Sequence, residues 1–285
     1  MKLLRVGTAG SERPALLDAE GNLRDLSGIV PDIDGALLAD DAALDRIRSA
    51  ADAGELPVLD ATGLRVGPPL ARVGKIVCVG LNYHDHARET GLEPPAEPVL
   101  FFKAADTVVG PYDTVLVPRK SEQTDWEVEL AVVIGRTARY LDSHEEALAH
   151  VAGYAISHDV SERHFQLERG GTWDKGKNCE TFNPLGPWLV TADEVPDPQQ
   201  LGLRLWVNGD LKQNGTTAEQ IFGVAEVVRY VSQFMTLYPG DVINTGTPAG
   251  VALGEPDPKP FLRAGDVVEV EIDGLGRQRQ EFKDA

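Results

Sequence analysis

Two glutamates occupy alternate positions in the segment from residue 124 to 134, Thr-Asp-Trp-Glu-Val-Glu-Leu-Ala-Val-Val-Ile. This composition predicts a β-strand, and successive side chains of a strand point to opposite faces. Glu127 and Glu129 are therefore expected on one face, about 6.5–7 Å apart along the strand. Both faces continue in apolar residues, so we expect a strand buried on both sides, with carboxylates that need a cation. The alternative is a solvated acidic face, which is the more common situation for a Glu-x-Glu strand.

A third carboxylate, Asp159, directly follows another predicted strand, Val151–His158. Glu127, Glu129 and Asp159 would form an all-oxygen ligand set, which suits a hard cation such as Mg²⁺, with Mn²⁺ or Ca²⁺ as alternatives. Three carboxylates would leave coordination positions open for water and substrate. Taken alone, Asp159 has an equally good interpretation as the cap of the helix predicted after it.

His86 and Glu89 are three residues apart in a segment of helical character. Side chains at that spacing share one helix face, so the carboxylate would orient the imidazole as a general base. An ordinary surface pair is the alternative. Lys177 is a candidate for local positive charge, and the segment Thr245-Gly246-Thr247-Pro248 for carboxylate binding through a hydroxyl and backbone N–H groups. A solvated lysine and a simple turn are the corresponding alternatives.

The composition limits the classes of partner. The chain has 285 residues, enough for one large domain or a domain with a small appendage. Its 45 acidic and 27 basic residues give a formal charge of −18, which disfavours nucleic acid and anionic membranes as partners. A small anionic substrate would need capture by local positive charge. Two cysteines without metal-type spacing and the lack of a long apolar run or signal-peptide pattern predict a soluble, cytoplasmic protein.

Short segments of strand composition outnumber helical ones and do not alternate with them regularly, which predicts a β-rich α+β fold. Strands are expected at residues 2–6, 15–17, 23–26, 76–80, 99–102, 151–158 and 203–207 and after the turns near residues 240 and 265. Helices are expected at residues 36–53, 161–169 and 221–234, and a loop at 176–187. A stretch rich in proline and glycine at 56–74 predicts a boundary between a small N-terminal domain, residues 1–70, and a main domain, residues 71–285.

Five separated motifs give the sequence a resemblance to the fumarylacetoacetate hydrolase superfamily over roughly residues 75–275. In chain order they are Val79-Gly80-Leu81-Asn82-Tyr83-x-Asp85-His86-x-x-Glu89, Glu127-x-Glu129, His158-Asp159-Val160-Ser161-x-Arg163, Gly176-Lys177 and Thr245-Gly246-Thr247-Pro248-x-Gly250-Val251. The resemblance implies a β-rich catalytic fold of mixed sheets, usually in a homodimer, with Mg²⁺ or Mn²⁺ on Glu127, Glu129 and Asp159. It also implies Lys177 beside the metal, a lid that carries His86 and Glu89, and substrate contacts from Arg163, Gln166 and Thr247.

One position departs from the pattern of relatives that cleave acylpyruvates. Many of those relatives carry arginine where this chain has Leu81. Leu81 together with the segment 165–173 resembles the subgroup that acts on 2,4-diketo-3-deoxy sugar acids, such as those derived from L-rhamnose or L-fucose. The resemblance therefore favours a sugar acid over a simple acylpyruvate.

The chemistry implied by the resemblance is hydrolysis of a C–C bond in a 2,4-diketo acid to pyruvate and a carboxylic acid. The substrate would chelate the metal, His86 oriented by Glu89 would activate water, and the metal with Lys177 would stabilise the pyruvate enolate. Decarboxylation, dehydration or tautomerisation of a 2-keto acid would use the same enolate. Outside this class, the alternatives are a non-catalytic metal-dependent binding protein and an unrelated structural protein with a solvated acidic strand.

Overall fold

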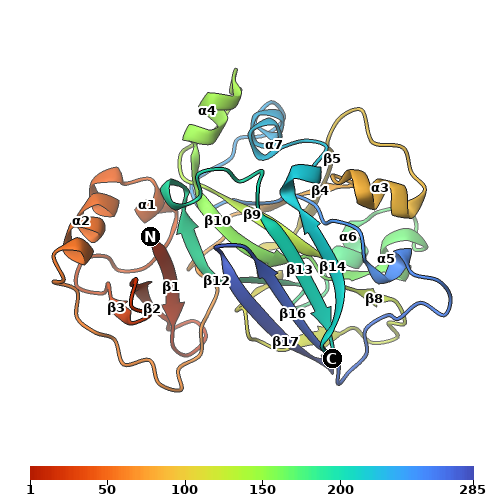
Figure 1. The fold of residues 1–285 in the computed structure, drawn as a ribbon, viewed down its shortest axis with the longest axis horizontal. Helices are drawn as coiled ribbons and strands as arrows, with labels where there is room; N and C mark the ends of the chain where they lie inside the picture. Colours follow the sequence, from red (N-terminus) through yellow and green to blue (C-terminus); the bar gives the residue numbers. More distant parts are fainter.

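The computed structural model describes residues 1–285, and its largest element is a ten-stranded mixed sheet (Figure 1). The order across it is β3-β2-β1-β12-β10-β9-β15-β4-β5, and β6 pairs with β12. These strands span Leu23–Asp25 (β3), Arg13–Leu17 (β2), Lys2–Val6 (β1), Asn183–Thr191 (β12), Val151–His158 (β10), Val128–Ile134 (β9), Val242–Asn244 (β15), Ile76–Gly80 (β4), Val99–Lys103 (β5) and Val108–Val109 (β6).

A five-stranded sheet forms the second layer, with the order β14-β13-β16-β17-β7. Its strands span Asp210–Thr216 (β14), Gly202–Val207 (β13), Val267–Ile272 (β16), Gly276–Asp284 (β17) and Val115–Val117 (β7). A small antiparallel pair joins Thr124–Asp125 (β8) to Ser161–Glu162 (β11). Strand β8 lies just before Glu127, and β11 leads directly into the helix at Arg163–Leu167.

The helices are short and lie at the margins of the sheets (Figure 1). The α-helices span Gly35–Leu38 (α1), Asp41–Asp52 (α2), His84–Thr90 (α3), His144–Ala149 (α4), Arg163–Leu167 (α5), Asp174–Lys177 (α6) and Val224–Val231 (α7). Four 3₁₀ turns span Ala105–Thr107 (η1), Ala192–Glu194 (η2), Thr217–Glu219 (η3) and Ala252–Gly254 (η4). None of these helices has the length and apolarity that crossing a membrane would require.

Strand β9 is buried along its whole length because different layers cover its two faces. Val128 and Leu130 belong to a core cluster that also contains side chains of β13 and β16 from the five-stranded sheet. Ala131 and Val133, on the opposite face, belong to a second cluster shared with α1 and α2. The single strand predicted at residues 124–134 is divided into β8 and β9, with Trp126 and Glu127 between them. The prediction that the strand is buried on both sides is confirmed for β9, and Glu127, just before it, and Glu129, near its start, are both buried.

The predicted β-rich α+β fold is confirmed, and the strands Lys2–Val6, Ile76–Gly80 and Val151–His158 have the predicted bounds. The helix predicted at 36–53 is divided into α1, which ends in the C-cap Ala39, and α2, whose N-cap Asp40 accepts a hydrogen bond from Ala43 N–H. The helix predicted at 221–234 is shorter, Val224–Val231.

The loop predicted at residues 176–187 is wrong at both ends. Gly176 and Lys177 lie in α6, and β12 begins at Asn183. Two prolines, Pro184 and Pro187, made this segment unlike a strand, because proline cannot donate to a sheet ladder. In the structure Pro187 lies where the register between β10 and β12 shifts, which is a position that tolerates proline.

The first three strands extend the same ten-stranded sheet as the rest of the chain. Strand β1 pairs with β12 through Lys2–Val190 and Leu3–Leu189. Side chains of residues 1–70 share one core cluster with β4 and β9. The boundary near residue 70 stays a prediction.

The packing around β9 generates a test of stability. Leu130→Ala removes a fully buried side chain and is expected to lower the free energy of unfolding by about 2–5 kcal/mol. Leu148→Ala, at a leucine that is 40% exposed on α4, is the matched control and is expected to cost about 0.5 kcal/mol or less. Chemical denaturation measures both, and equal losses would show that β9 is not the centre of the core.

Candidate metal centre and active-site cavity

Three carboxylates converge where β9 begins and β10 ends. Glu127, Glu129 and Asp159 each offer an oxygen, and these oxygens lie within 4.8 Å of one another. The residues are 5%, 2% and 0% exposed. Asp159 N–H donates to Glu127 O at 3.0 Å, and this backbone bond holds the two strand ends together. The solvated-face alternative is wrong, because all three carboxylates are buried.

Asp159 does not cap the helix that follows it. Glu162 accepts from His164 N–H at the start of α5, whereas the Asp159 carboxylate accepts from two ammonium groups. Lys177 Nζ lies 2.9 Å from Oδ2 and Lys103 Nζ lies 2.5 Å from Oδ1. Lys103 was missed by the sequence analysis, and its only signal there was a lysine directly after an apolar strand segment.

Lysine and arginine charges act unequally on the two glutamates. Burial raises the pKa of Glu127, but the positive charges of Lys177 and Arg163 outweigh this effect and lower that pKa to about 2. Burial raises the pKa of Glu129 well above its usual value, and the negative charges of Asp159 and Glu127 raise it further. Glu127 is therefore firmly ionised, whereas the positive charge of Lys177 does not outweigh the effects of burial and of the neighbouring carboxylates on Glu129.

The donor set fits a divalent cation. Glu129 lines the cavity, and its carboxylate accepts one hydrogen bond, from Gly246 N–H to Oε2 at 2.8 Å. Neither Lys103 nor Lys177 forms an ion pair with the Glu129 carboxylate. A buried charge without such a partner is costly. Three carboxylate oxygens from Glu127, Glu129 and Asp159 suit a hard divalent ion, which would supply the missing positive charge.

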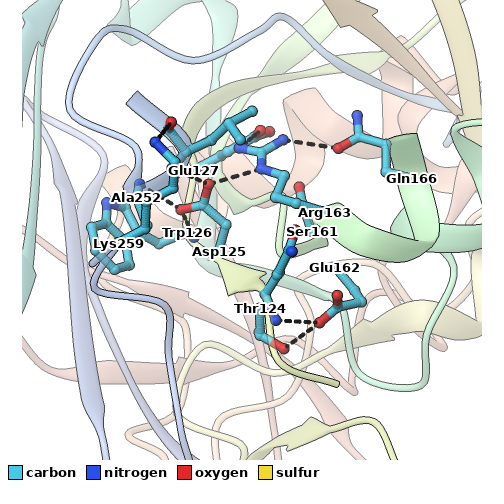
Figure 2. A network of polar contacts seen from close by, with 12 residues as sticks. Thr124, Asp125, Trp126, Glu127, Ser161, Glu162, Arg163, Gln166, Ala252 and Lys259 are labelled. Atoms are coloured by element: carbon cyan, nitrogen blue, oxygen red, sulfur yellow. Dashed lines mark hydrogen bonds and ion pairs between the residues drawn. The ribbon is translucent and has the colours of Figure 1, made fainter. Parts of the chain in front are cut away.

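Arg163 and Gln166 lie beside the carboxylates on α5 (Figure 2). Arg163 Nε donates to Asp125 Oδ2 at 2.8 Å, and Nη2 forms an ion pair of 2.7 Å with Glu127 Oε1. Arg163 Nη1 donates to Gln166 Oε1 at 3.0 Å. Gln166 lines the cavity, and its amide NH₂ keeps its donors available because Arg163 engages only Oε1. Asp125, which also accepts from Ala252 and Leu253 N–H, was missed as the residue that orients Arg163.

His86 and Glu89 form the pair that their spacing predicts. His86 Nδ1 lies 3.1 Å from Glu89 Oε2, and Glu89 Oε1 accepts from Gly250 N–H at 2.8 Å. Both residues line the same cavity as Glu127 and Glu129, so the surface-pair alternative is wrong. With Nδ1 facing Glu89, His86 Nε2 is free to meet a water molecule or a substrate.

Thr247 lies at the predicted place but its hydroxyl is already engaged. The Oγ1 donates to Val128 O at 2.9 Å and accepts from Gln213 Nε2 at 2.8 Å. The preceding Gly246 N–H holds Glu129. This segment therefore fixes the start of β9, and Thr247 contributes to the cavity wall.

The cavity that unites these groups has a volume of about 520 Å³, within the range of small-molecule sites. Its polar end contains two acidic residues, Glu127 and Glu129, together with Lys177, Arg163 and Gln166. Its other walls are largely apolar and include Leu81, Leu92, Phe101, Leu167, Trp173 and Leu253. Gly80 allows the Trp173 ring to approach, because a Cβ there would lie 2.4 Å from the ring. The cavity therefore suits a small, partly apolar ligand with a polar group at the end beside the carboxylates.

Comparison with known proteins agrees with this geometry. A family profile described as fumarylacetoacetate (FAA) hydrolase C-terminal matches residues 75–283. A Burkholderia ambifaria relative that carries the provisional name of hydrolase is 52% identical, with both chains covered completely. Fumarylacetoacetate hydrolase from Exiguobacterium antarcticum is 35% identical with a TM-score of 0.86, again over all of both chains.

Another similar structure was solved with ligands. It is maleylpyruvate hydrolase from a Sphingobium species in complex with manganese(II) and pyruvate, 28% identical with a TM-score of 0.82 over all of both chains. The sequence match over most of the chain and the similarity in fold lead to one assignment. The chain belongs to the fumarylacetoacetate hydrolase family.

Proposed function

We propose that this protein is a divalent-metal-dependent hydrolase that cleaves a C–C bond in a 2,4-diketo acid to give pyruvate and a carboxylic acid. One observation carries the proposal: two members of the buried carboxylate cluster, Glu127 and Glu129, line the same cavity as the His86–Glu89 pair. Carboxylates alone would suit metal binding, and the histidine pair adds a group that can move a proton. The manganese and pyruvate bound to the maleylpyruvate hydrolase from Sphingobium support the same reaction class.

Glu127, Glu129 and Asp159 would hold the ion, with Mg²⁺ as the proposed metal and Mn²⁺ or Ca²⁺ as alternatives. When bound, the ion would polarise the keto-acid end of the substrate as a Lewis acid. Gln166 would donate its free amide hydrogens to the same end. Arg163 would keep Glu127 and Gln166 in place through its ion pair and hydrogen bond.

His86 would act as the general base. Glu89 accepts the Nδ1 hydrogen, so Nε2 carries the lone pair that removes a proton from water. The resulting hydroxide would attack the carbonyl at C4, and the bond between C3 and C4 would then break. Glu89 would stabilise the imidazolium ion formed at this step, because its carboxylate stays in contact with the ring.

Lys177 would stabilise the negative charge that develops on the departing pyruvate fragment. Burial lowers the pKa of Lys177, but Asp159 and Glu127 outweigh this effect and raise the pKa above its usual value. The ammonium is therefore fully charged and held at 2.7 Å from Glu127 Oε2. A preorganised charge in a dry site needs little reorganisation during the reaction.

Finer features of the proposal rest on resemblance. Leu81 and the segment 165–173 support a 2,4-diketo-3-deoxy sugar acid as substrate, and both contribute side chains to the cavity. A homodimer and a cytoplasmic location are proposed on the same basis. The reaction proposed for the cavity does not depend on the homodimer or on the location.

The experiment that tests the function is a screen of 2-keto and 2,4-diketo acids with Mg²⁺ and coupled pyruvate detection. The proposal expects pyruvate and an equimolar carboxylic acid from diketo acids, and no release after chelation of the metal. Release of CO₂ from oxaloacetate alone would identify a decarboxylase instead. Metal-dependent binding of these acids without turnover would identify a binding protein.

Loss of one metal ligand gives the next prediction. Glu127→Gln keeps the shape of the side chain but removes its charge. We expect Mg²⁺ affinity in calorimetry to fall by more than the roughly 10- to 100-fold typical of losing a residue behind a metal ligand. Glu145→Gln, at an exposed acid on α4, is the control. Unchanged Mg²⁺ affinity in Glu127→Gln would remove this residue from the metal site.

Another prediction separates the role of His86 as general base from the role of the metal ligands. His86→Ala removes the proton acceptor but no ligand, so hydrolysis is expected to fall by about 10²- to 10⁴-fold. Binding of oxalate with Mg²⁺ should stay within threefold of wild type, about 0.65 kcal/mol. His144→Ala, at an exposed histidine, should leave both properties intact. Full hydrolysis by His86→Ala would transfer the role of base to another group.

A further inference from the structure

Lys259 differs from the other lysine and arginine side chains that line the cavity. Lys177 is paired with Glu127 and Asp159, and Arg163 is paired with two carboxylates of its own. Lys259 Nζ instead donates to the backbone carbonyls of Leu253 and Glu255, at 2.6 and 2.7 Å, and no carboxylate forms an ion pair with it. Its positive charge is therefore held in place without being neutralised.

The ammonium of Lys259 has capacity for a ligand. A lysine has three N–H donors, and the two carbonyls account for two of them. The side chain is partly buried and lines the cavity, so water compensates its charge less fully than at an open surface. An anionic group in the cavity would supply both the missing acceptor and the missing charge.

The position of Lys259 indicates which part of a ligand it would meet. It follows η4, whose Gly254 lies so close to Glu89 that a Cβ there would be 2.3 Å from the Glu89 carboxyl carbon. In Figure 2 Lys259 lies on the same side of Arg163 as Ala252, and Gln166 lies on the opposite side. Lys259 thus reaches the cavity from the side of the His86–Glu89 pair.

The proposed function then defines the direction of the substrate. With the keto-acid end at the triad and C4 at His86, the chain beyond C4 would extend past Glu89 toward Lys259. Leu92 and Leu253, which also line the cavity, would contact the methylene carbons of that chain. The end of the chain would meet the uncompensated ammonium.

We propose that Lys259 is a specificity-determining residue that binds a second carboxylate, at the far end of the substrate. This inference rests on the proposed function. The substrate class is then a dicarboxylic 2,4-diketo acid. The hydroxyl groups of a sugar acid would accept a hydrogen bond from Lys259 but would not neutralise it. This charge therefore favours a carboxylate over the hydroxylated end expected from the resemblance.

The kinetic test uses two seven-carbon substrates that differ only at the far end, succinylpyruvate and butyrylpyruvate. Hydrolysis adds one water and gives pyruvate with succinate or butyrate. Wild type is expected to favour succinylpyruvate in kcat/KM, and Lys259→Met to reduce that preference by about 10- to 100-fold, the strength of a hydrogen bond to a charged group. Lys259→Arg should keep most of the preference, and Lys283→Met, at an exposed lysine, should keep all of it.

A binding test separates this inference from the proposed function. Calorimetry with Mg²⁺ compares 2-oxopimelate with 2-oxoheptanoate, seven-carbon acids that lack the 4-keto group and differ only in the terminal carboxylate. Preferential binding of 2-oxopimelate by wild type that Lys259→Met abolishes would support the role of Lys259 even if neither diketo acid were hydrolysed. Equal affinity of wild type for the two acids, or the same loss for both in Lys259→Met, would overturn it.

Discussion

Burial of three carboxylates at one place is the constraint on which this site depends. Each anion removed from water costs several kcal/mol unless a partner compensates it. Lys103 and Lys177 compensate Asp159, and Lys177 with Arg163 compensates Glu127. Glu129 has one backbone N–H and no cation. The protein thus neutralises most of the cluster by itself and leaves a deficit that a divalent ion would correct.

The fold meets this constraint by joining segments that are distant in sequence. The adjacent ends of β9 and β10 bring two of the acids together, and α6 supplies Lys177 from the segment after α5. Strand β5, at the edge of the sheet, supplies Lys103. Gly176 permits the approach of α6, because a Cβ there would lie 2.4 Å from Glu162 O. Sheet packing and electrostatics therefore act on the same few residues.

The sequence predicts those parts of the site that depend on local periodicity. Alternation along β9 places Glu129 on the face of Ala131 and Val133. Helical spacing places Glu89 beside His86, as the structure has it. Lys103 and Asp125 could not be found in this way, because they act on residues 56 and 38 positions away. The same limit applies to β12, where Pro187 is tolerated because it lies at the register shift between β10 and β12.

The central claim is that Glu127, Glu129 and Asp159 form one cation site inside the cavity. Crystals grown with Mn²⁺ and measured for anomalous scattering would test it most directly. The account predicts one strong peak about 2.1 Å from an oxygen of each carboxylate, the distance of a small hard cation. A peak that contacts none of the three carboxylates would contradict it. So would a fully occupied Mn²⁺ site elsewhere in the protein with no ion bound to Glu129.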